Sequence, residues 1–149
     1  MAFFIDDIFP DSTLSAVCEV MEHEEAFEDG SKTASGAARK VKNNRQARPD
    51  QVQGARELIK RALAKHADFQ AAALPSEIAR IAFSRYEPGM AYGAHVDNAY
   101  IGGVRTDLSF TVFLSDPDSY DGGELIIRRF DGDEAVKLPK GSLYLYPSD

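Results

Sequence analysis

The sequence predicts an α+β fold in which supporting helices precede a β-sandwich or jelly-roll core. Two observations lead to this prediction. In the first half of the 149-residue chain, apolar residues recur at the i, i+3, i+4 spacing of amphipathic helices. From Pro75 onward, short runs alternate with period 2 and are separated by turn signals such as Asp121-Gly122-Gly123. We therefore expect a helical support region over residues 1–75 and a β-rich core over residues 76–149.

Two helices are expected in the support region. The first follows a capping residue, Asp11 or Ser12, and its apolar stripe consists of Leu14, Val17, Cys18 and Met21. The second begins near Pro49, which suits a first helical turn, and its stripe consists of Val52, Ala55, Ile59, Ala62, Leu63, His66 and Phe69. Residues 30–38 have the composition of a loop. The basic segment 39–48 is expected to be a solvated loop rather than a phosphate site, because no aromatic side chain interleaves its charges.

Six strands are expected in the core, over residues 78–86, 91–97, 106–115, 124–129, 134–138 and 142–146. Glycine- and proline-containing turns separate them, as in a fold of many short strands. A double-sheet jelly roll uses about eight strands. We therefore expect the last strands of the core to be missing from this chain, so that its jelly roll is incomplete.

The composition limits the classes of function. The chain has 17 Lys and Arg against 24 Asp and Glu, a net charge of −7, so it repels a phosphate backbone and nucleic acid is not the expected partner. The single cysteine, Cys18, excludes an internal disulfide, and a buried structural thiol is favoured over a reactive one. No segment has the pattern of a signal peptide or the length of a membrane span. We expect a cytoplasmic protein without membrane contact, and homo-oligomerisation stays open.

His95 and Asp97 form the candidate chemical centre. In a strand, residues i and i+2 project to the same face, so one imidazole and one carboxylate converge. Such a pair supplies two of the three ligands of the 2-His-1-carboxylate triad that holds non-haem Fe(II). A surface or core pair without metal is the alternative, because His-x-Asp is a short pattern. Of the other histidines, His66 is expected to be packed and hydrogen-bonded within its stripe, and His23 to be exposed.

A series of motifs surrounds His95 and Asp97. In the motif at residues 85–97, a tyrosine, a glycine-containing turn and a second tyrosine precede His-x-Asp. In chain order the motifs occupy residues 41–44, 71–75, 85–97, 105–115, 119–125 and 138–148. Together they resemble the prolyl-hydroxylase-like Fe(II)/2-oxoglutarate-dependent dioxygenases, and within that superfamily the PKHD-type hydroxylases. The resemblance covers nearly the whole chain.

The resemblance implies a double-stranded β-helix fold, which is a cupin-like jelly roll, and hydroxylase activity on a peptidyl or small-molecule substrate. His95 and Asp97 would bind Fe(II). The co-substrates would be 2-oxoglutarate, which is converted to succinate, and O2, with L-ascorbate keeping the iron reduced. Tyr86 matches a position that contacts 2-oxoglutarate, and the alternative for it is an ordinary strand aromatic. For Tyr92 the ordinary aromatic role is favoured. Phe113 stands where some relatives place a tyrosine that binds 2-oxoglutarate.

The chain departs from the family pattern at its end. The distal iron-binding histidine would follow Ser148 by a few residues, and the basic residue that pairs with the far carboxylate of 2-oxoglutarate would come later. We therefore expect a C-terminal truncation of a longer hydroxylase, because neither His23 nor His66 stands in the position of the missing ligand. Two other functions remain: a metal-free jelly-roll module that binds a ligand or partner, and a cupin-like zinc or manganese enzyme.

Overall fold

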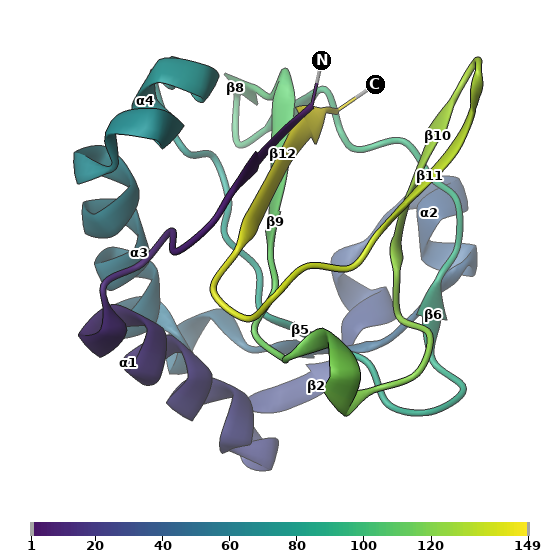
Figure 1. Ribbon diagram of the computed structural model, residues 1–149. Helices are drawn as coiled ribbons and strands as arrows, with labels where there is room; N and C mark the ends of the chain where they lie inside the picture. The colour runs from purple at the N-terminus through teal and green to yellow at the C-terminus, as the bar shows by residue number, and fades with distance from the viewer. Residues whose placement is uncertain (1, 149) are drawn as a thin grey trace.

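An antiparallel sheet in the order β1–β12–β9 lies at the centre of the fold. The computed structural model describes residues 2–148, and it places β12 (Leu143–Pro147) between β1 (Phe3–Ile5) and β9 (Leu108–Val112). Within residues 2–148, the first strand therefore pairs with the last one, and Figure 1 shows the two lying side by side. This sheet separates the packed interior into two parts.

Three helices pack against one face of this sheet: α1 (Asp11–Glu22), α3 (Gln53–Lys65) and α4 (Ala67–Ala73). They lie together on the left of Figure 1. The larger core forms between them and the sheet, and its most deeply buried side chains are Ile8, Val17, Val52, Leu63, Phe69, Leu143 and Leu145. Burying each large side chain of this kind stabilises the fold by about 1.5–3 kcal/mol. The helical region is thus a support for the central sheet.

The opposite face of β12 contacts a β-hairpin, formed by β10 (Leu125–Arg129) and β11 (Gly132–Val136). A second, smaller core of Phe113, Val136 and Tyr144 lies here. Side chains alternate along a strand, so Leu143 and Leu145 enter the helical core while Tyr144 and Tyr146 enter the smaller one. The sheet is therefore covered on both faces.

The remaining strands are short and form three small sheets, β2–β4–β5, β3–β6 and β7–β8. Their bounds are Phe27–Asp29 (β2), Lys42–Asn43 (β3), Arg45–Ala47 (β4), Ser84–Arg85 (β5), Ala91–Tyr92 (β6), Tyr100–Ile101 (β7) and Val104–Arg105 (β8). The prediction of a solvated loop over residues 39–48 is wrong, because β3 and β4 occupy this segment and Asn44 and Gln46 are buried. These sheets bring the support region next to the segment that carries His95.

The structure confirms the position of the first predicted helix but not its predicted cap, and it changes the predicted loop that follows. The first helix is confirmed, but Pro10 is its N-cap residue and Asp11 is already helical, so neither Asp11 nor Ser12 caps it. The predicted loop over 30–38 contains a 3-10 turn, Gly30–Thr33, and the start of α2, Gly36–Lys40.

The second predicted helix is not continuous. The 3-10 turn Pro49–Gln51 leads into α3, which ends at Lys65, and α4 starts at Ala67. His66 has the extended backbone angles φ −81° and ψ 110°, so the helical hydrogen bonds stop there. The apolar stripe continues across this break because α3 and α4 cover the same core.

The strand predictions are confirmed closely for the later strands and are wrong for the earlier ones. Strands β9, β10, β11 and β12 lie within two residues of the predicted ranges at most of their ends. Over 78–86, by contrast, only β5 is a strand. Its partner β4 has three residues, and only two of these pair with residues of β5. Ile81 and Phe83 are still buried. The period-2 pattern there reflects the burial of every second side chain and not strand pairing.

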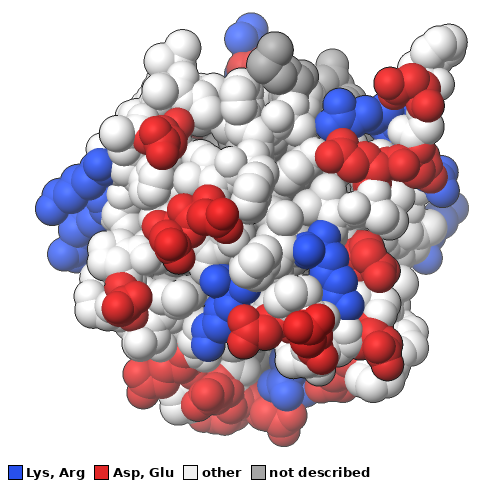
Figure 2. Space-filling model, viewed as in Figure 1, with Lys and Arg blue, Asp and Glu red and all other residues white. Residues whose placement is uncertain are grey.

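Acidic side chains gather along the lower edge of the surface in Figure 2, around the end of α1 and β2. Glu19, Glu22, Glu24 and Glu25 are all exposed. Cys18 on the same helix is half-buried, so the burial predicted for its thiol is only partial. None of the helices within residues 2–148 combines the length and apolar character that a membrane crossing requires.

Candidate functional site

His95 and Asp97 lie in a segment, residues 93–99, which follows β6, has no regular secondary structure and bends at Ala94 and Ala99. The prediction of a strand over 91–97 is therefore wrong beyond Tyr92. Strand β6 pairs antiparallel with β3, so the residue after Tyr92 would have to pair with Val41. Val41 directly follows α2 and has φ −108° and ψ 4°, which is not strand geometry, so the ladder stops after a last bond from the Gly93 N–H to the Val41 carbonyl, 2.8 Å long. The backbone beyond it is held by other contacts.

The two side chains nevertheless face each other, as the i, i+2 spacing predicts. Nε2 of His95 lies 3.4 Å from Oδ1 of Asp97. The side chain of His95 is 23% exposed and that of Asp97 is 38% exposed, so solvent reaches both although each is partly covered by protein. The two side chains therefore meet although this segment does not pair as a strand.

A backbone contact orients the His95 ring. Nδ1 lies 2.8 Å from the Gly93 carbonyl oxygen, which accepts hydrogen bonds only, so in the neutral ring the proton resides on Nδ1. The lone pair of Nε2 is then directed toward Asp97. The Tyr92 ring stacks on the imidazole with centroids 3.6 Å apart and planes 11° apart, and the Lys42 ammonium lies 4.9 Å from the Tyr92 centroid. Tyr92 therefore packs directly against the candidate ligand.

The Asp97 carboxylate is held at its other oxygen. The Ser109 hydroxyl donates a hydrogen bond of 2.6 Å to Oδ2, and the Ser148 hydroxyl lies 3.0 Å from that of Ser109. Sequence reasoning missed both serines. Ser109 stands 12 residues from Asp97 and Ser148 stands 39 residues from Ser109, so only the pairing of β9 with β12 brings them together.

Tyr86 lies just beyond β5 and is 48% exposed. Its hydroxyl oxygen accepts a hydrogen bond of 3.0 Å from Nδ2 of Asn44, a side-chain amide on a residue only 3% exposed. Partial burial of the phenol raises the pKa of Tyr86, and the bond from Asn44 offsets a part of that rise. The phenol therefore keeps its proton at neutral pH.

Two further tyrosines lie close to Asp97. Burial raises the pKa of Tyr92 and of Tyr146, and the negative charge of Asp97 raises both further. Tyr146 on β12 is a residue that sequence reasoning did not select as part of the site. Its only signal was the alternation along β12, which places Tyr144 and Tyr146 on the face opposite the helical core. The phenols of Tyr92 and Tyr146 near this carboxylate therefore keep their protons at neutral pH.

Comparison with known proteins agrees with the motifs. The model of the 2OG-Fe(II) oxygenase superfamily matches residues 81–149. A PKHD-type hydroxylase of Picosynechococcus sp. (strain ATCC 27264 / PCC 7002 / PR-6) is 42% identical over 99% of this chain and 68% of its own length. The chain belongs to the PKHD-type hydroxylase family. This confirms the family that the ordered motifs predicted.

Relatives of this family extend over more sequence than this chain does. A PKHD-type hydroxylase of Parvibaculum lavamentivorans is 50% identical over 87% of this chain, and this chain spans 59% of its length. Another, of Maricaulis maris, is 51% identical, and this chain spans 55% of it. Among solved structures, a prolyl-4-hydroxylase of Pseudomonas putida superposes with a TM-score of 0.63 at 20% identity, over 99% of this chain and 79% of that chain. That similarity establishes a shared mixed helix-and-sheet fold.

The other histidines lie elsewhere in this PKHD-type fold. His66 is half-buried, and its Nδ1 accepts a hydrogen bond of 3.4 Å from the Phe69 N–H at the start of α4, which confirms the packed and hydrogen-bonded role predicted for it. His23 is exposed and pairs with Glu25 at 3.3 Å. Across residues 2–148, the structure assembles no group of three His, Cys, Asp or Glu side chains that could hold a metal ion. Neither histidine therefore joins His95 and Asp97.

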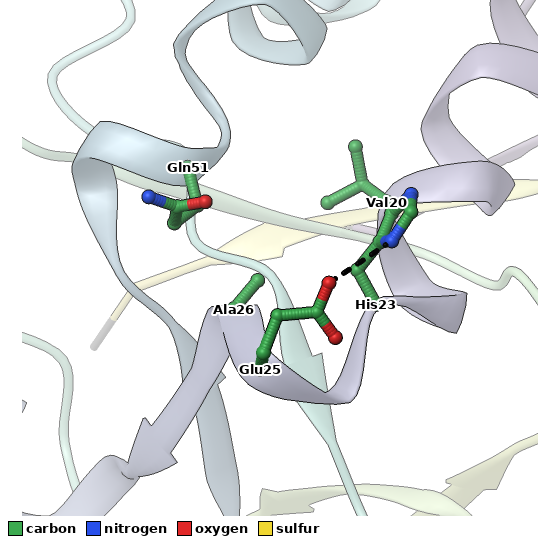
Figure 3. Close-up of a pocket in the computed structure, with 5 residues that line it drawn as sticks. All are labelled: Val20, His23, Glu25, Ala26 and Gln51. Carbon is green, nitrogen blue, oxygen red and sulfur yellow. Dashed lines mark ion pairs between the residues drawn. The ribbon is translucent and has the colours of Figure 1, made fainter.

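His23 and Glu25 instead line a separate pocket of about 270 Å³, which Figure 3 shows. Its other lining residues are Val20, Ala26 and Gln51. The pocket lies where the end of α1 meets the 3-10 turn Pro49–Gln51, and it includes none of the residues predicted to bind iron or 2-oxoglutarate.

Phe113 belongs to the smaller core and is 9% exposed, so its ring is a packing element.

Proposed function

We propose that this chain carries part of the active site of an Fe(II)- and 2-oxoglutarate-dependent dioxygenase, in which His95 and Asp97 are metal ligands and Tyr86 contacts the co-substrate. The observation that carries the proposal is the approach of His95 Nε2 to Asp97 Oδ1, 3.4 Å apart, with Nδ1 occupied by a backbone carbonyl. A neutral imidazole nitrogen and a carboxylate oxygen are donors that suit Fe(II). Iron bound there would couple the decarboxylation of 2-oxoglutarate by O2 to hydroxylation of a substrate.

The protein groups around this pair would then orient the ligands and the co-substrate. Gly93 fixes the imidazole through its carbonyl, and Tyr92 covers one face of the ring. The Tyr86 oxygen already accepts a hydrogen bond from Asn44, so its own proton is available to a carboxylate of 2-oxoglutarate. The substrate would be a peptidyl residue or a small molecule. Both the requirement for L-ascorbate and a cytoplasmic location remain predictions.

The proposal includes a jelly-roll arrangement of the sheets. The smaller core of Phe113, Val136 and Tyr144 lies between the central sheet and the β10–β11 hairpin, as a layer between two facing sheets would. In this arrangement residues 76–149 form the jelly-roll core, and residues 1–75 provide helices and the strands β1, β3 and β4 that pair with it. The candidate ligands then lie at one end of the central sheet, next to β9.

The proposal is tested by titrating the chain with Mn(II), an oxygen-stable substitute for Fe(II), and by measuring succinate formation with Fe(II), 2-oxoglutarate, ascorbate and O2. We expect weak but saturable Mn(II) binding, because His95 and Asp97 supply two of the three ligands of the triad, and succinate that depends on Fe(II). A peptide pool and a small-molecule pool, added separately, distinguish the two substrate classes. If Mn(II) neither binds nor raises the melting temperature, the metal-free binding module becomes the better description.

Replacing Tyr86 with phenylalanine is expected to weaken the binding of 2-oxoglutarate by about 10–150-fold, because a hydrogen bond to a charged group contributes about 1.5–3 kcal/mol. Mn(II) affinity should not change, since the phenol is not a proposed ligand. The KM for 2-oxoglutarate, or its Kd for the Mn(II)-loaded chain, measures the effect. Tyr100→Phe, on a β7 tyrosine that is 65% exposed, serves as the matched control. Equal KM values for the two variants would remove Tyr86 from the site.

A further inference from the structure

The segment that carries His95 and Asp97 is fixed at its ends by backbone contacts. The Gly93 N–H donates to the Val41 carbonyl at 2.8 Å. At the other end, the Thr106 N–H donates to the Ala99 carbonyl at 2.9 Å, and the Thr106 hydroxyl donates to the Asn98 carbonyl. Between these two ends, the bond from Ser109 to Asp97 ties the segment to the central sheet. This bond acts on the carboxylate itself.

The hydroxyl protons of Ser109 and Ser148 have a definite arrangement. A serine hydroxyl has one proton, and the Ser109 proton is donated to Oδ2 of Asp97. In the 3.0 Å contact between the two serines, Ser148 must therefore be the donor and Ser109 the acceptor. Ser109 lies in β9 opposite Tyr146 of β12, so the backbone that carries it is held by the central sheet. The donor aimed at Asp97 is rigidly placed.

This bond restricts the rotation of the carboxylate. The terminal torsion of an aspartate is broad, so a carboxylate held at neither oxygen samples many orientations. With Oδ2 engaged by Ser109, Oδ1 stays on the side of His95 Nε2. Outer partners of this kind are known to orient metal ligands, and their loss typically costs about 10–100-fold in metal affinity.

We propose that Ser109 is a positioning residue, which holds Oδ2 of Asp97 so that Oδ1 remains directed at a metal ion shared with His95. Ser148 supports it by supplying the hydrogen bond that commits the Ser109 proton to Asp97. The inference rests on the proposed function, because it assigns Asp97 to a metal. It adds a residue from β9 and one that follows β12 to a site otherwise carried by the segment after β6.

The test measures Mn(II) affinity by calorimetry together with the melting temperature of the metal-free protein. Ser109→Ala should raise the Mn(II) Kd about tenfold, and Ser109→Thr, which keeps the hydroxyl, should restore it. Ser148→Ala should raise it by a smaller factor. The matched control is Ser142→Ala, which removes a similar serine–carboxylate bond, 2.8 Å to Asp6, from a residue only 1% exposed. It should lower the melting temperature and leave the Kd unchanged.

The outcomes separate the two proposals. If wild-type protein binds Mn(II) and Ser109→Ala binds it equally well, Ser109 does not position the ligand, while the proposed function stands. If Ser142→Ala raises the Kd as much as Ser109→Ala, the effect is one of general stability and the inference is also overturned. If the wild-type protein binds no Mn(II), both proposals fall. Should Ser109→Ala be unfolded, Ser109→Thr and Ser148→Ala are compared by the same measurements. A wild-type Kd for Ser109→Thr with a raised Kd for Ser148→Ala supports the inference, and an unchanged Kd for Ser148→Ala overturns it.

Discussion

Asp97→Ala is expected to abolish measurable Mn(II) binding and, with it, any formation of succinate. The variant removes one of the two proposed ligands and leaves His95 without the carboxylate that faces it at 3.4 Å. The loss should exceed the roughly 10–100-fold that removal of an outer partner costs, because a direct metal ligand is lost. Calorimetric titration and an assay of succinate over a range of Fe(II) concentrations measure it.

The control for this variant is Asp107→Ala. Asp107 is also an aspartate in the same part of the chain, and its side chain is 63% exposed and pairs with Arg105 at 3.0 Å. An exposed ion pair contributes about 0–1 kcal/mol to stability, so this variant should fold and bind Mn(II) as the wild type does. Unaltered Mn(II) binding by Asp97→Ala, or an equal loss in Asp107→Ala, would contradict the assignment of Asp97 as a ligand.

Gly30→Ala is expected to be the most disruptive substitution of a single glycine near the site. A Cβ atom at Gly30 would overlap Oδ1 of Asn44 and lie 3.0 Å from both its Cγ and its backbone oxygen. Asn44 is 3% exposed and its amide also donates to Tyr86, so a shift that relieves the overlap is expected to disturb that bond. Overpacking of this kind costs about 1–3 kcal/mol of unfolding free energy. We therefore expect lower stability together with weaker 2-oxoglutarate binding.

Denaturant unfolding and the KM for 2-oxoglutarate measure the two effects of Gly30→Ala. Gly54→Ala is the matched control, because a Cβ atom there meets nothing within 4 Å and the residue lies in the first turn of α3. Alanine is the better helix former, so this variant should be stabilised by up to about 1 kcal/mol. If Gly30→Ala is as stable as Gly54→Ala and binds 2-oxoglutarate normally, Asn44 is not held in the way the structure indicates.

The part of the candidate site that could be predicted from the sequence is the part that depends on local geometry. His95 and Asp97 meet at the i, i+2 spacing that the sequence shows, although the predicted strand is absent at that point. The contacts that hold them could not be predicted in the same way. Asn44 and Tyr86 are 42 residues apart, and no local pattern reports contacts over such a separation.

The same distinction applies to the fold. Apolar periodicity located α1, α3 and α4, because it reports which side chains enter the core. It could not show that the backbone breaks at His66, since Leu63 and Phe69 are buried on both sides of the break. Strands β1 to β4 have two or three residues each, which is too short for an alternating pattern to be recognised. Their positions depend on partners elsewhere in the chain.

The pairing of β1 with β12 also sets an order of events during biosynthesis. Leu143–Pro147 is synthesised long after Phe3–Ile5, so all the residues between them must be made before these strands can pair. The contacts between α1 and α3 span a much shorter stretch of sequence and can form earlier. Until β12 emerges, the apolar residues of β1 have no strand partner. Closure of the central sheet is therefore a late step of folding, and it is slowed by the long loop that it must close.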